Sequence, residues 1–179
     1  MNQCNRKKGI ALLMAMIVTG TLLLIVYSLS SISYKQLILS YTGKESQLAF
    51  YAADTGIECA LFWDTKNPSS FSGQSAFSTS TAATSISCSG NVISAKPKNV
   101  PTVPQATNTV LGGGGIRNAT STFHILIDKA LGLDGPCAIV RVGKRYTGNQ
   151  LFTTIISRGY NTCDINSDRR LERALRAIY

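Results

Sequence analysis

The chain has 179 residues, of which 44% are hydrophobic and 15% charged, and its formal net charge is +9. This length excludes two sizeable domains and suits one modest domain behind a membrane segment. A single histidine and the lack of a Cys-x-x-Cys motif exclude an ordinary zinc site, so no metal or cofactor is expected.

The N-terminus joins a short basic segment to a long apolar one. Arg6, Lys7 and Lys8 precede Gly9, and residues 10–32 contain no charge and no proline. About 20 apolar residues suffice to cross a hydrocarbon core as a helix. We therefore expect residues 10–32 to span the cytoplasmic membrane once, with the basic flank inside and the remaining chain outside.

Other N-terminal signals explain this pattern less well. A secretory signal peptide has an apolar region of about 7–15 residues that ends at an Ala-x-Ala-like site, and no such site follows residue 32. A lipoprotein signal needs a cysteine after the apolar segment, whereas Cys4 precedes it. An uncleaved signal anchor stays open as an alternative.

The helical pattern continues beyond the membrane segment. We expect residues 33–64 to extend the helix and to pack on the domain, although Gly43 and Gly56 each weaken a helix by about 1 kcal/mol relative to alanine. Asn67-Pro68 should stop it. The residues near helical spacing on the expected packed face are Leu37, Tyr41, Leu48, Ala52 and Leu61.

Residues 65–179 are expected to form a β-rich domain outside the membrane. The Ser/Thr-rich segment 69–91 suggests loops with one or two short strands, and 97–118, with three prolines and four consecutive glycines, suggests a surface loop. Residues 147–149 supply a turn, and the last run, 169–179, fits a helix or a strand. Runs rich in β-branched and aromatic residues predict strands at 121–128, 136–146 and 150–160.

Three segments resemble one family of proteins. The sequence RKKGIALLMAM, residues 6–16, resembles the class III-like cleavage site of type IV prepilins, which a prepilin peptidase cuts after the glycine. GKESQLAFYAADTGIECALFWD (43–64) and the closing RGYNTCD and DRRLERALRAIY (158–164 and 168–179) look like PilX-type minor pilins. The resemblance covers roughly residues 6–64 and 152–179.

The resemblance implies a processing site and a fold. Residues 1–9 would be a leader removed between Gly9 and Ile10, and residues 10–32 would be retained to pack against other pilin subunits. It favours a strand for 169–179 and an α+β architecture, in which a long N-terminal α-helix packs on an antiparallel β-sheet. Most major pilins carry a glutamate five residues after the cut, where this chain has Met14. That departure favours a minor or tip subunit.

Five cysteines are present, and Cys4 would leave with the leader. The remaining four are an even number in an oxidising compartment, which predicts two disulfides. Three pairings are possible. We favour the pairing in which both partners of each bridge lie on neighbouring segments of the expected fold, namely Cys59–Cys88 and Cys137–Cys163.

Positive charge gathers late in the chain. Without residues 1–9, which hold three basic residues and no acidic one, the formal charge is +6. A basic face of this kind could bind DNA or an acidic surface weakly, while a solvated face that keeps the domain soluble explains it more simply. The residues concerned are Lys144, Arg145, Arg158, Arg169, Arg170, Arg173 and Arg176.

No pattern indicates catalysis, so we expect a protein that is not an enzyme. His124 lies in an apolar run and suits a sheet or core position. Asp54, Glu58 and Asp64 share the expected helix, where solvated charges are the simplest interpretation. The sequence thus favours a minor pilin-like subunit that serves adhesion, DNA uptake, motility or secretion. The alternative is a signal-anchored extracytoplasmic binding domain.

Overall fold

The computed structural model describes residues 3–66, 75–79, 85–94, 117–128 and 130–179. They form two compact units, Met1–Gly43 and Lys44–Tyr179, which are described separately. Asn67-Pro68 and most of the expected surface loop 97–118 lie outside the described residues.

A single long helix, α1 (Gln3–Leu61), contributes to both units and ends in a π-helical turn, Phe62–Lys66. In the first unit every residue from 10 to 43 is exposed. Its most apolar window has a mean hydropathy of 2.5 with nothing buried, so this helix is long and apolar enough to span a membrane. Thr19 donates its hydroxyl to the Ala15 carbonyl at 2.9 Å, which satisfies that polar group within the helix.

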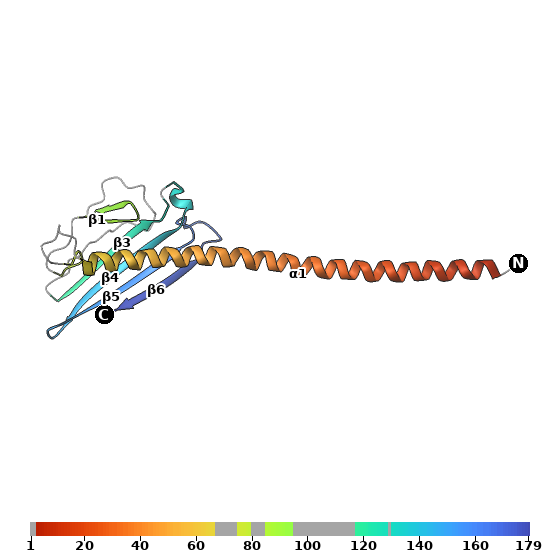
Figure 1. The fold of residues 1–179 in the computed structure, drawn as a ribbon, viewed down its shortest axis with the longest axis horizontal. Helices are drawn as coiled ribbons and strands as arrows, with labels where there is room; N and C mark the ends of the chain where they lie inside the picture. Colours follow the sequence, from red (N-terminus) through yellow and green to blue (C-terminus); the bar gives the residue numbers. More distant parts are fainter. Residues whose placement is uncertain (1–2, 67–74, 80–84, 95–116, 129) are drawn as a thin grey trace. The chain divides into compact units, whose positions relative to one another are not determined.

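The second unit contains a four-stranded antiparallel sheet in the order β3-β4-β5-β6 (Figure 1). Its last strand confirms the strand interpretation of the C-terminal run. Gly148, at φ 62°, lies in the turn that joins β4 to β5. The strands are β3 (Asn118–Leu126), β4 (Cys137–Thr147), β5 (Gln150–Tyr160) and β6 (Glu172–Ile178).

A short hairpin lies within the Ser/Thr-rich region. It consists of β1 (Ser85–Cys88) and β2 (Asn91–Ser94), which pair antiparallel. Ser89 and Gly90 between them have positive φ angles of 49° and 68°, as two-residue hairpin turns require. One of the one or two short strands expected in 69–91 is therefore present as β1, and its partner β2 runs on past the end of that segment.

The domain end of α1 packs across the sheet, which gives the expected α+β fold (Figure 1). Its packed face agrees only in part with the expected stripe: Ala52 is buried as expected, but Leu48 is 37% exposed, and the other buried residues of this face are small. A Cβ atom on Gly159 of β5 would lie 2.1 Å from the Ala49 carbonyl oxygen and 2.2 Å from the Ala53 nitrogen. Backbones this close leave no room for leucine. The buried helix residues include Ala49, Ala52, Ala53 and Ala60.

The core lies between the helix, the hairpin and the inner face of the sheet. Phe77, in the segment 75–79, stacks on Phe123 of β3 with ring centroids 5.7 Å apart. Inward residues of β1 to β5 complete the core: Ile86, Ile93, Ile125, Ala138, Val140, Val142 and Ile155. Gly56 belongs to this interface, because an added Cβ would lie 2.8 Å from Val140 Cγ2. It therefore permits close packing as well as weakening the helix.

Candidate functional site

The expected processing site, Gly9–Ile10, lies inside α1. Proteases bind their substrates as extended chains, so cleavage at this bond would require the helix to unwind locally. Glycine lowers the energy of that unwinding because it favours the helical conformation least among residues other than proline. Ile10 is exposed, as are the residues that follow it.

Two disulfides fasten the domain, and they join the pairs favoured from the sequence. Cys59–Cys88 links α1 to β1, and Cys137–Cys163 links the start of β4 to the segment after β5, with Cα atoms 5.9 and 5.7 Å apart. Closing loops of this size typically stabilises a fold by about 3 kcal/mol.

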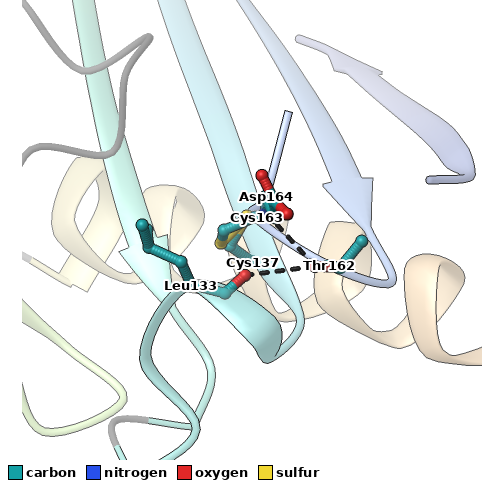
Figure 2. The surroundings of a disulfide bond; sticks show 5 residues. All are labelled: Leu133, Cys137, Thr162, Cys163 and Asp164. Atoms are coloured by element: carbon teal, nitrogen blue, oxygen red, sulfur yellow. Dashed lines mark hydrogen bonds between the residues drawn. A yellow bond between two sulfur atoms is a disulfide. The ribbon is translucent and has the colours of Figure 1, made fainter. Parts of the chain in front are cut away.

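Beside the second disulfide, the backbone carbonyl of Leu133 accepts several hydrogen bonds (Figure 2). The Leu133 oxygen accepts hydrogen bonds from Thr162 Oγ1 at 3.1 Å and from the backbone N–H groups of Cys163 and Asp164, both at 2.9 Å. The bonds and the bridge hold two loops together at one end of the sheet. The role of this region is therefore structural.

A buried ion pair joins the end of the helix to the sheet. Asp64 Oδ1 lies 2.6 Å from Lys144 Nζ, and the two side chains are 3% and 5% exposed. Tyr179 donates its hydroxyl to Asp64 Oδ2 at 2.6 Å, and Ser75 donates to Oδ1. Burial and the bond to Asp64 raise the pKa of Tyr179. The pair thus anchors the C-terminal residue beside the helix end.

This pair corrects two sequence interpretations. Lys144 is not part of a basic outer face, and Asp64 is not a solvated helix charge, because each neutralises the other inside the domain. The strand pattern held a signal for Lys144: it occupies an inward position in register with Ala138, Val140 and Val142. An inward lysine indicates a buried acidic partner.

A second polar contact fixes the helix to the loop before β6. Asn161 Nδ2 donates to Glu45 Oε2 at 2.6 Å and to the Arg169 carbonyl at 3.0 Å, while its Oδ1 accepts from the Leu171 N–H at 2.6 Å. Arg173 Nε donates to Ser46 Oγ at 2.8 Å. Arg173 therefore serves the helix–sheet contact.

The remaining basic residues divide between two environments. Arg170 is half-buried, with its guanidinium 3.9 Å from the centre of the Tyr160 ring. It therefore stacks on the domain and is not a free surface charge. Arg145, Arg158, Arg169 and Arg176 are exposed, as expected.

Among the described residues, no group of three or more His, Cys, Asp or Glu side chains could hold a metal ion. Glu58 is exposed and Asp54 half-buried, without a basic partner in the described part of the chain.

His124 lies in β3, where it is half-buried, and burial lowers its pKa. The unfolded chain therefore binds more protons than the folded one between that lowered pKa and about 6.5. Stability should rise with pH through this window and fall on acidification. We expect His124→Asn to flatten that dependence between about pH 5.5 and 7.5 in urea unfolding. An unchanged slope would contradict this expectation.

Comparisons with family models, curated proteins and solved structures returned no match. The functional assignment therefore depends on the chain's own features. They are the bare apolar helix, the small-residue interface between helix and sheet, and the two disulfides.

Proposed function

We propose that this chain is a minor, non-enzymatic subunit of a type IV pilin-like filament. The observation that carries the proposal is the continuous helix α1, whose residues 10–43 are all exposed while residues further along pack into a disulfide-linked domain. An apolar surface of this extent is stable only in lipid or against other apolar helices.

Assembly would then exchange one apolar environment for another. The chain would first be held in the cytoplasmic membrane with its domain outside, and would move to the cell surface when it joins a pilus or pseudopilus. Outside the bilayer, residues 10–27 can be covered only by helices of other subunits. Small residues on this segment permit close helix approach, namely Ala11, Ala15, Thr19 and Gly20.

A minor or tip role fits the residue five positions after the proposed cut. A carboxylate at this depth in lipid is unfavourable by several kcal/mol unless it is paired. Met14 removes that need for pairing. The outputs that such a subunit could serve are adhesion, DNA uptake, motility and secretion.

Processing supplies the direct test of this proposal. N-terminal sequencing of the protein isolated from its own host should begin at Ile10. Replacing Gly9 by leucine should leave the leader in place, because the peptidase needs a small residue before the cut. Gly43→Leu is the matched control, since nothing lies within 4 Å of that position, and it should be processed normally.

The alternative function is a signal-anchored extracytoplasmic binding domain that never assembles. The same apolar helix supports it, because an anchor needs nothing more. An N-terminus at Met1 or Asn2 in the mature wild-type protein would favour this alternative and contradict the pilin proposal.

A further inference from the structure

The face of the sheet turned away from α1 has a distinct composition. Along β4, the buried residues Ala138, Val140, Val142 and Lys144 alternate with residues that point to the opposite face. Those residues include the exposed Arg141 and Arg145. The same alternation places Arg158 of β5 and Arg176 of β6 on the opposite face. We call these four side chains, Arg141, Arg145, Arg158 and Arg176, the arginine face.

The strand register brings the four arginines together. Arg141 lies opposite Ile156, and Ile156 lies opposite Arg176, so one row of the sheet reads Arg-Ile-Arg. Arg158 lies in the adjacent row, opposite Ile139 and Ala174. Arg145 lies opposite Phe152, which is 45% exposed.

This positive charge is only partly neutralised. Glu172 is the acidic residue of the same face, and it lies 3.7 Å from Arg158 while also accepting a hydrogen bond from Tyr160 at 2.7 Å. Arg141, Arg145 and Arg176 form no ion pair within the described part of the chain. The domain therefore holds three exposed guanidinium groups on one face without a structural use for them.

The spacing of the arginines suits a ligand with repeated charges. Arg141 and Arg145 are four residues apart on one strand, or about 13 Å, and Arg141 and Arg176 are two strands apart, or roughly 10 Å. Four guanidinium groups carried on backbone positions this widely spaced suit several anionic groups better than one small anion. A polymer or surface that presents many anions can contact all of them.

All four positions are arginine, and this favours phosphate as the anion. Guanidinium forms two parallel hydrogen bonds to one phosphate group, whereas a membrane surface attracts lysine and arginine alike through net charge. Ile156, which lies between Arg141 and Arg176, and Phe152, which lies beside Arg145, offer apolar surface that can contact sugar rings. We propose that the arginine face binds the phosphodiester backbone of nucleic acid without reading its sequence. This inference holds whether or not the chain enters a filament.

The test uses the full-length protein in nanodiscs of neutral lipid and a fluorescent 20-base-pair DNA duplex of mixed sequence, with binding followed by anisotropy. The logarithm of the binding constant should fall with the logarithm of salt concentration with a slope of roughly −3 to −4, one phosphate per arginine. The double variant R141E/R176E should bind at least about tenfold more weakly at 50 mM salt, with a slope smaller in magnitude by about 2.

The matched control is K35E/K66E, which changes the net charge equally at two exposed lysines outside the arginine face. It should bind DNA nearly as the wild type does. Trp63 fluorescence during unfolding checks that both variants are folded. Three results would overturn the proposal: no binding at 50 mM salt, an equal loss in the control, or binding of phosphatidylserine vesicles in place of DNA.

Discussion

Gly159→Ala should destabilise the domain by about 3 kcal/mol or more, at the upper end of the range for overpacking. The added methyl group would lie 2.1 and 2.2 Å from backbone atoms of Ala49 and Ala53. Helix backbone cannot rotate aside as a side chain can, so α1 would have to move away from the sheet. Denaturant unfolding of the purified chain, followed by the fluorescence of Trp63, measures the change.

Two glycines provide graded comparisons for this experiment. Gly143→Ala on β4 places its methyl group 3.8 Å from the Thr154 carbonyl, an ordinary contact, and should change stability by less than about 1 kcal/mol. Gly56→Ala meets the Ser157 hydroxyl and the Val140 Cγ2 methyl, which are side-chain atoms and not backbone, and should fall between the two. An unfolding midpoint of Gly159→Ala equal to that of the wild type would refute the close packing of helix and sheet.

Asp64→Ala should lower the free energy of unfolding by about 3–5 kcal/mol, because it leaves the charge of Lys144 buried without a partner. It also removes the acceptor for the Tyr179 hydroxyl at the C-terminus. Trp63 is adjacent in sequence, and its indole donates to the Ser87 carbonyl at 2.9 Å, so its emission should report the loss directly.

The matched control for this substitution is Asp54→Ala on the same helix, with an expected change of about 0.5 kcal/mol or less. The double variant D64A/K144M removes both charges and should recover much of the lost stability, because a buried ion pair can be replaced by apolar groups of similar size. If Asp64→Ala alone were no less stable than Asp54→Ala, the anchoring role of the pair would be wrong.

The strands were largely predictable because each pattern is local. β-Branched and aromatic residues located the sheet, and the expected strand 150–160 coincides with β5. β3 begins at Asn118, within the expected surface loop, because pairing of Asn118 with Arg145 extends the ladder beyond the apolar residues. The ambiguous C-terminal run forms a strand because β5 has a free edge on the side away from β4. Residues from Glu172 onward pair with that edge.

The buried face of the helix was harder to predict, because the size of a side chain decided its burial more than its hydrophobicity did. Leu48 and Ala49 are both plausible core residues, and hydropathy favours leucine. The helix backbone lies so close to Gly159 that only a small residue fits where the two touch. Gly159 and Ala49 are 110 positions apart in the sequence, so no local pattern shows this constraint. The pairing of Asp64 with Lys144 is similarly non-local: the alternation along β4 could have shown that Lys144 points inward, but not that Asp64 is its partner.

The filament proposal requires that the apolar half of α1 is covered by other subunits at the cell surface. Immunoblotting of filaments sheared from the cell surface and purified away from membranes tests it most directly, with an antibody against the domain. The wild-type chain should be present in the filament fraction, and the Gly9→Leu variant should be absent from it. A wild-type chain found only in the membrane fraction, beside filaments that lack it, would contradict the proposed assembly.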